Sequence, residues 1–289
     1  MLEVLTFQYT QLPDPGTFVV GFLAIVLGAA LAAGLMEPPA EPLSRSYYFL
    51  RIGIASMALV AVQVCWLFYA STLQYGLSWL MLASDLLSAL AYGAYMIRIA
   101  QQRSRDAYGH TGRAWMALVP FANLFLLFKS SQTPDTAPGS TAAALAGLAL
   151  IILGRLATPV LLSAVEERTL AGLQQPEIQA AATALRVRAL GTATALDILI
   201  EAEGAPLVIQ TGLTLTEVTR ADLHVTYEFK LDQADAEVLA DDYRAQVTDN
   251  FCKGLMVYLT AGATATLHYV RTDGRDLGRV ELSLAECTT

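Results

Sequence analysis

The segment from Thr141 to Val165 constrains the fold of this chain more than any other segment. Its sequence is TAAALAGLALIILGRLATPVLLSAV, in which Arg155 is the only charged residue. A helix crosses a bilayer with about 20 predominantly apolar residues, so this segment is long enough to do so. Of the 26 acidic residues in the chain, 19 lie after Val165. The sequence therefore predicts a transmembrane helical domain over residues 1–165 and a water-soluble domain over residues 166–289.

Three earlier segments also have the length and composition of membrane-spanning helices. They are Thr17–Met36, Phe49–Leu73 and Leu77–Ala100. The residues before Thr17 contain no basic cluster and no small-residue cleavage site, so we expect no cleavable signal peptide. Together with the segment that starts at Thr141, these helices predict a membrane α-helical bundle of four spans.

The segment Ala114–Phe128 is apolar but shorter than the roughly 17 residues that a span needs. It contains Pro120 and Asn123, which are uncommon in a lipid-facing helix. We interpret it as a short interfacial or re-entrant helix that returns to the side it left. The alternative is a fifth full span, which would move the C-terminal domain to the other side of the membrane.

The basic residues predict the orientation of the bundle. Seven lysine and arginine residues precede Thr141, and all lie in or beside the connections after the first span, the third span and the short segment. Four spans place these connections on one side, which the positive-inside rule makes the cytoplasm. We therefore expect a multi-pass protein of the bacterial inner membrane, with the N-terminus outside and the C-terminal domain in the periplasm.

Three polar side chains fall within the predicted spans at about the same depth. Asp85, Arg155 and Gln63 each lie roughly 12–15 Å from the outer ends of their helices, at 1.5 Å per residue. Charges at such depth cost about 2.5–3.5 kcal/mol each and usually pair. We therefore predict an Asp85–Arg155 ion pair with Gln63 nearby. Such a pair could serve only to fix the packing of the helices, which is the interpretation we favour. The alternative is that it forms part of a proton or ion relay.

A cluster of basic residues follows the third span in a loop that we expect to be cytoplasmic. The cluster could bind anionic lipid headgroups or a cytoplasmic partner, or it could serve only as the topology signal, which we favour. Asp106 is expected to pair with a neighbouring arginine or to cap the following segment. The residues of this basic loop are Arg98, Arg103, Arg105, Asp106 and Arg113.

The C-terminal domain combines predicted helices and strands. Apolar residues recur at helical spacing after Pro176, until Gly204-Ala205-Pro206 ends the pattern. Asp222–Lys230 alternates apolar and polar residues, as a half-buried strand does. The predicted fold is α+β, with a small antiparallel sheet and helices on one face. The other predicted elements are strands over Leu207–Val218, Ala263–Arg271 and Arg279–Ala285, and helices over Asp232–Phe251 and Gly254–Ala261.

The cysteine and histidine residues give little indication of chemistry. Cys65 lies in an apolar run and is expected to be a small buried residue. Cys252 and Cys287 could form a disulfide if their domain faces an oxidising space, or they could both be free thiols. No C-x-x-C, phosphate-binding loop or hydrolase motif occurs, and no spacing brings His110, His224 and His268 into one metal site. We expect no enzyme activity, no metal and no cofactor, and the acidic C-terminal domain makes nucleic acid an improbable partner.

Part of the membrane domain resembles a family of small bacterial inner-membrane proteins of unknown function. The similarity covers Arg103–Trp115, with the sequence RSRDAYGHTGRAW, and Ala117–Asn123. These proteins carry an R-x-R-D-x-G loop before an apolar segment with proline and asparagine. The present chain has extra residues around Tyr108 and Arg113.

The C-terminal part resembles small, disulfide-bearing periplasmic domains of bacterial proteins. Their pattern includes an alternating strand with two aromatic residues, a helix that ends in Asn and Cys, and a final acidic residue followed by Cys. The matching residues here are Pro206, Tyr227, Phe229, Asn250, Cys252, Leu259, Gly262, Tyr269, Asp273, Gly274, Glu286 and Cys287, whereas Gln210, Leu213 and Arg271 depart from the pattern. The resemblance implies a Cys252–Cys287 disulfide and no known catalytic activity.

The functional expectation is binding rather than catalysis. We expect a scaffold, assembly or accessory subunit of a membrane complex, in contact with membrane lipid, whose periplasmic domain docks one or more protein partners. The alternative is a small transporter or ion-relay protein that uses Asp85 and Arg155.

Overall fold

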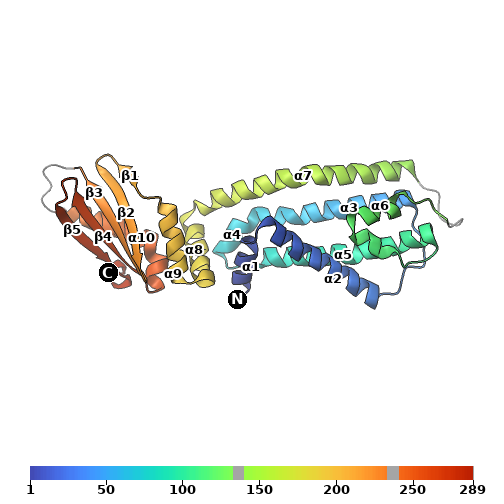
Figure 1. Ribbon diagram of the computed structural model, residues 1–289, viewed down its shortest axis with the longest axis horizontal. Helices are drawn as coiled ribbons and strands as arrows, with labels where there is room; N and C mark the ends of the chain where they lie inside the picture. The colour runs from blue at the N-terminus through green and yellow to red at the C-terminus, as the bar shows by residue number, and fades with distance from the viewer. Residues whose placement is uncertain (133–139, 233–240, 289) are drawn as a thin grey trace. The chain divides into compact units, whose positions relative to one another are not determined.

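The computed structural model describes residues 1–132, 140–232 and 241–288. The chain divides into two compact units, residues 1–178 and 179–289. The first is helical, and the second contains a five-stranded sheet (Figure 1). Each unit is described separately below.

Four helical segments of the first unit are long and apolar enough to cross a membrane. They are α2 (Asp14–Leu35), the continuous run Arg45–Gln74, α5 (Trp79–Tyr108) and α7 (Thr141–Leu173). The run Arg45–Gln74 consists of α3 (Arg45–Gln63), a 3-10 segment η1 (Val64–Phe68) and α4 (Tyr69–Gln74). The prediction of four apolar helices of spanning length is confirmed, and the segment Ala114–Phe128 is not among them in the part of the chain that the structure describes.

One long helix extends well beyond its predicted end, and one helix was not predicted. Helix α5 continues eight residues beyond Ala100 and ends where Gly109 adopts a left-handed conformation with φ 76°. Most of the predicted basic loop is therefore helical. The N-terminal residues form a further helix, α1 (Leu2–Thr10), where the sequence predicted no element. Its apolar residues do not follow a helical period, so its position depends on packing against α5.

The four long helices form two tight pairs, α2 with α5 and α3 with α7. Glycine permits the close approach in both pairs. A Cβ on Gly28 or Gly93 would overlap a backbone carbonyl oxygen of the partner helix in the first pair. In the second pair, a Cβ on Gly53 would lie 2.6 Å from the carbonyl oxygen of Gly147. Small residues that let helix backbones approach are a recurrent device of membrane helix packing. The two pairs meet along α3 and α5, which pack more loosely.

The short apolar segment forms a 3-10 turn, η2 (Ala114–Leu118), and a short helix, α6 (Pro120–Phe128). Both of its ends lie at the same end of α5. The backbone nitrogen of Arg113 donates to Ser104 Oγ at 3.3 Å, and the nitrogen of Gln132 donates to the Asp106 carbonyl at 2.8 Å. The segment therefore leaves one end of the bundle and returns to it, which supports the re-entrant interpretation and an even number of crossings.

Two helical regions of the second unit are divided differently from the prediction. The helical region after Pro176 forms two helices, and the two helices predicted around Phe251 and Gly254 form one. Gly191 separates α8 (Pro176–Leu190) from α9 (Thr192–Glu203), and Gly204 ends α9 in a left-handed conformation. Helix α10 (Asp241–Thr260) runs continuously through the predicted break near Gly254. The predicted start of this helix, including Leu239, falls outside the described residues. A final short helix, α11 (Leu284–Cys287), replaces the end of the last predicted strand, and Leu284 is exposed.

The sheet has the strand order β1-β2-β3-β4-β5. The strands are β1 (Leu207–Gln210), β2 (Leu213–Ala221), β3 (His224–Leu231), β4 (Thr264–Arg271) and β5 (Asp276–Leu282). The prediction of a fully antiparallel sheet was wrong, because β3 and β4 pair in parallel. Helix α10 lies between them in sequence and supplies the crossover that a parallel pair requires. The predicted first strand is a hairpin of β1 and β2 with Gly212 in the turn.

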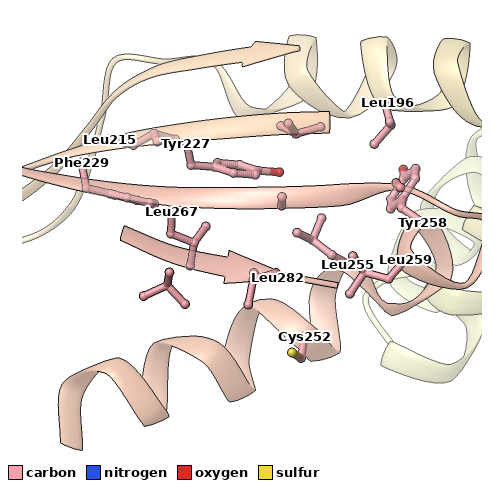
Figure 2. Packing of buried hydrophobic residues seen from close by; sticks show 14 of the residues in the cluster. Leu196, Leu215, Tyr227, Phe229, Cys252, Leu255, Tyr258, Leu259, Leu267 and Leu282 are labelled. Carbon is pink, nitrogen blue, oxygen red and sulfur yellow. The ribbon is translucent and has the colours of Figure 1, made fainter. Parts of the chain in front are cut away.

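The core of this unit lies between one face of the sheet and helices α9 and α10. Figure 2 shows Leu215, Tyr227 and Phe229 from the sheet facing Leu255 and Leu259 of α10. The inward residues of β3 alternate as the sequence predicted, because Val225, Tyr227 and Phe229 are all buried. Burial raises the pKa of the Tyr227 phenol far above its usual range, so this side chain stays neutral.

Candidate functional site

Asp85 lies in a small pocket among α1, α2, α3 and α5. The pocket has a volume of about 160 Å³, and its lining includes Tyr9, Gln63 and Ser88. The Tyr9 hydroxyl donates to Asp85 Oδ2 at 3.1 Å. The side-chain oxygen of Gln63 is buried and has no hydrogen-bond partner among the described residues. The structure thus brings Asp85 and Gln63 to one site, as predicted, and adds Tyr9 from a helix that sequence analysis missed.

Arg155 does not join this site. It is an exposed residue of α7, which packs mainly on α3. No ion pair joins Arg155 to Asp85 within the described part of the chain, and the hydrogen bonds to Asp85 come from Tyr9 and Trp66 instead. The predicted Asp85–Arg155 pair is therefore absent. The matching depths of these residues along two helices were apparent from the sequence, but depth says nothing about which helices are neighbours.

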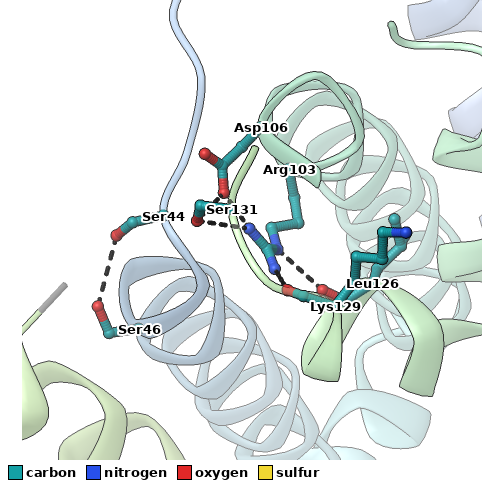
Figure 3. A network of polar contacts seen from close by, with 7 residues as sticks. All are labelled: Ser44, Ser46, Arg103, Asp106, Leu126, Lys129 and Ser131. Atoms are coloured by element: carbon teal, nitrogen blue, oxygen red, sulfur yellow. Dashed lines mark hydrogen bonds and ion pairs between the residues drawn. The ribbon is translucent and has the colours of Figure 1, made fainter. Parts of the chain in front are cut away.

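A buried ion pair lies at the opposite end of the bundle. The side chains of Arg103 and Asp106 are fully buried and in contact (Figure 3). Arg103 Nε also donates to the Leu126 carbonyl at 2.8 Å, and its Nη2 donates to the carbonyl of Lys129. Ser131 Oγ donates to Asp106 Oδ2 at 2.6 Å. This cluster, which we call the arginine clamp, ties the C-terminal end of α6 to α5.

A second polar contact holds the same segment against α3. The hydroxyl of Tyr48, which is fully buried, donates to Asn123 Oδ1 at 2.8 Å. Tyr48 of α3 and Arg103 of α5 thus hold the re-entrant segment from two different helices. Asn123 drew attention in the sequence as an uncommon residue in an apolar segment, and this contact gives it a structural role.

The other basic residues of the predicted loop have separate environments. Arg98 donates to the carbonyl of Glu37, and Arg105 Nη1 donates to the carbonyl of Ala40 at 2.8 Å. The guanidinium of Arg113 lies 4.9 Å from the centre of the Tyr108 ring, a cation–π distance. Lys129 Nζ lies 5.0 Å from the centre of the same ring, Arg51 Nη1 donates to Gln102 Oε1, and Arg45 is the first residue of α3. All seven basic residues before Thr141 therefore lie at the end of the helical unit that holds the arginine clamp.

The sheet unit contains the disulfide that the resemblance implied. Cys252 of α10 and Cys287 of α11 are bonded, with their Cα atoms 5.4 Å apart. A C-terminal disulfide suggests an oxidising compartment for this unit. Cys65, expected to be buried, is instead exposed on the surface of the helical unit, where lipid would cover it.

We expect loss of this disulfide to destabilise the sheet unit. It joins residues 35 apart in sequence, for which the chain-entropy model gives about 4 kcal/mol. The Cys252→Ala/Cys287→Ala variant of the full chain in detergent should lose about this much free energy of unfolding in a urea titration. Cys65→Ala is the control and should change it by under about 0.5 kcal/mol. Equal stability of the two variants would contradict the disulfide's role.

The two histidines of the sheet unit lie on the polar face of the sheet, where His224 makes hydrogen bonds and His268 lies near a carboxylate. His224 Nε2 lies 2.9 Å from Thr266 Oγ1, which donates to Glu281 Oε2 at 2.7 Å. His268 lies 3.4 Å from Asp276. No group of three or more His, Cys, Asp or Glu residues is close enough to hold a metal within the described ranges. In the β4–β5 turn, a hydrogen bond from Arg271 lowers the pKa of Asp273 to about 2.

The edge strand β1 exposes apolar side chains. Leu207, Val208 and Ile209 are 45%, 70% and 49% exposed. Only β2 pairs with β1 in the described residues, so the outer edge of β1 has no described partner strand. Exposed apolar residues next to an open backbone edge are a feature that proteins usually avoid. Sequence analysis missed this edge because it merged β1 with β2.

The fold and these sites define a class: a chain with four helices of membrane-spanning length and a disulfide-bonded sheet unit. Neither protein-family models nor curated protein sequences gave a match. Among solved structures, the chain is similar to a protein of Pseudomonas aeruginosa described as secreted, with a TM-score of 0.30, 17% identity, and coverage of 33% of this chain and 92% of that one. It is also similar to the pilotin of the Vibrio vulnificus type 2 secretion system, with a TM-score of 0.29, 13% identity, and coverage of 34% and 89%. Both TM-scores are too low to support a functional conclusion.

Proposed function

We propose that this protein is a non-enzymatic accessory or assembly subunit of a bacterial inner-membrane complex. The four long helices embed it in the membrane, and the disulfide-bonded sheet unit acts as a docking domain in the periplasm. The shared end of the seven basic residues supports this orientation, because that end would face the cytoplasm. With an even number of crossings, the residues after α7 lie on the same side of the membrane as the N-terminus, which is the side opposite the basic end.

The observation that carries the docking role is the exposed edge of β1. An extended segment of a partner polypeptide can add a strand to such an edge, with backbone hydrogen bonds for affinity and side-chain contacts for specificity. Leu207, Val208 and Ile209 offer apolar contacts on both faces of the strand. The register shift between Val208 and Gln210 limits the free edge to a short length. This irregularity disfavours unlimited edge-to-edge pairing but leaves room for one short segment.

The partner that fits is therefore an extended, apolar polypeptide segment of another protein in the complex. The alternative function, a transporter or ion relay, would require Asp85 and Arg155 to interact, and no described ion pair joins them. Asp85-dependent flux through the purified protein in vesicles would nevertheless favour that alternative and contradict an accessory role.

The docking role predicts that a charge on β1 abolishes partner binding. Val208→Lys should reduce recovery of a stoichiometric partner by about tenfold or more in a mild-detergent pull-down, because burying a large apolar side chain contributes about 1.5–3 kcal/mol. Thr219→Lys is the matched control, since Thr219 is an exposed residue of the interior strand β2. It should leave the recovery unchanged. A partner that is retained by both variants, or the absence of any stoichiometric partner, would contradict the proposal.

A further inference from the structure

The loose contact between α3 and α5 contains a second, larger cavity. It has a volume of about 470 Å³ and is almost entirely apolar. Its walls come from Ala55, Ala58 and Leu59 on α3 and from Ala91, Tyr92 and Tyr95 on α5. Ile54 at its rim is 51% exposed and Tyr95 is 39% exposed, so the cavity opens to the surface of the bundle as a groove. We call it the α3–α5 groove.

The groove adjoins the Asp85 pocket. Leu59 and Ser88 line both cavities. Between residues 54 and 62 of α3 the groove extends for about 12 Å at 1.5 Å per residue, and the Asp85 pocket lies at one end of it. The two adjoining cavities thus place an apolar groove beside a polar pocket.

The polar end offers a buried hydrogen-bond acceptor that lacks a donor. Asp85 already accepts hydrogen bonds from Tyr9 and Trp66, whereas the Gln63 side-chain oxygen accepts none within the described residues. Ser88 cannot serve as the donor, because its hydroxyl already donates to the Asp85 carbonyl at 2.8 Å. An unsatisfied buried acceptor costs about 1–3 kcal/mol, so a ligand that donates to it would stabilise the site.

We propose that the α3–α5 groove and the Asp85 pocket bind one membrane amphiphile. Its hydrocarbon chain occupies the groove, and an N–H or O–H donor on its head group contacts Asp85 and Gln63. The order of polar pocket and apolar groove agrees with the orientation of a lipid in a bilayer. The pocket lies toward the end of the bundle opposite the arginine clamp, and the groove runs from the pocket toward the middle of the bundle. A lipid in the leaflet at that end has its head and chain in the same order. The shared chemistry is a donor head on a single chain, either an ammonium or a hydroxyl.

The test uses matched pairs of amphiphiles that differ only in their donor. Binding to the full chain in nonionic detergent is measured by native mass spectrometry. Tetradecylammonium should bind at least about tenfold more tightly than tetradecyltrimethylammonium, which has no N–H. Tetradecanol and its methyl ether form the second pair. Preference within the first pair alone identifies an ammonium head, and preference within the second pair alone identifies a hydroxyl head.

Variants of the protein separate the groove from the polar end. Gln63→Leu removes the free acceptor, and Asp85→Asn removes the charge. In each variant, the affinities of the two amphiphiles in the preferred pair should differ by no more than about twofold. Ala91→Phe adds a ring to an exposed wall of the groove and should weaken the binding of both amphiphiles in the pair by tenfold or more. Leu27→Phe, on the exposed surface of α2, is the control and should leave the binding of both amphiphiles unchanged.

Three results would overturn the proposal. One is equal binding within both pairs to the unmodified chain. Another is binding that Ala91→Phe leaves intact. The third is a dimer of this chain that dissociates in Ala91→Phe, since it would identify a second copy as the occupant of the groove.

Discussion

Replacing Gly28 with alanine is expected to destabilise the helical unit by about 3 kcal/mol, which is at the upper end of the usual cost of overpacking. The added Cβ would overlap the backbone carbonyl of Leu90 on α5. A backbone atom cannot rotate away as a side chain can, so α2 and α5 must separate. The separation would also disturb the neighbouring contact between Gly93 and Ile25. The measurement is the free energy of unfolding of the purified protein, from titration with SDS in mixed micelles.

Gly34 provides the control on the same helix. A Cβ at Gly34 would meet no heavy atom within 4 Å. Because alanine loses less conformational freedom than glycine, Gly34→Ala should be neutral or more stable by up to about 1 kcal/mol. If Gly28→Ala and Gly34→Ala behave alike, the close packing of the α2–α5 pair would be contradicted.

Replacing Arg103 with leucine is expected to cost about 3–5 kcal/mol, because it leaves the carboxylate of Asp106 buried without its counter-charge. The carbonyls of Leu126 and Lys129 would also lose their donor. The end of the re-entrant segment would then lose its contact with α5. We expect faster proteolysis after Lys129 in addition to the loss of stability in the same SDS titration.

Arg105 is the matched control, two residues away on the same helix. It donates one hydrogen bond, to the carbonyl of Ala40, in an exposed position. Arg105→Leu should therefore cost no more than about 1 kcal/mol. The double variant Arg103→Leu/Asp106→Leu should be more stable than Arg103→Leu alone, since no charge is left buried. An Arg103→Leu variant as stable as Arg105→Leu would show that the clamp does not hold the segment.

Hydropathy and charge predicted much of the helical unit but not its pairing. Length and apolar composition identified all four long helices, because a bilayer requires about 20 apolar residues from each. Gly28 and Gly34 look alike in sequence, yet only Gly28 lies against a neighbouring backbone. Likewise, the four arginines near the end of α5 looked equivalent, and only Arg103 is fully buried. Which residues face a neighbour depends on helix rotation, which hydropathy does not determine here.

The same limit explains the outcome at the polar residues. The depth of Asp85 along α5 was apparent from the sequence, but its partner Tyr9 comes from α1, which has no amphipathic pattern. In the sheet unit, period-two alternation predicted β3 and its inward residues. The parallel pairing of β3 with β4 was missed, although the helix predicted between two strands is typical of such a crossover. The exposed β1 was missed because Gly212 was not interpreted as a turn.

The central claim is that the helical unit crosses the membrane four times and delivers the sheet unit to the periplasm. Reporter fusions after Thr289 test it most directly. Alkaline phosphatase, which becomes active only in an oxidising space outside the cytoplasm, should be fully active there, and a fluorescent protein that matures only in the cytoplasm should stay dark. A bright fluorescent fusion with an inactive phosphatase would place the sheet unit in the cytoplasm, and it would contradict both the number of crossings and the proposed docking role.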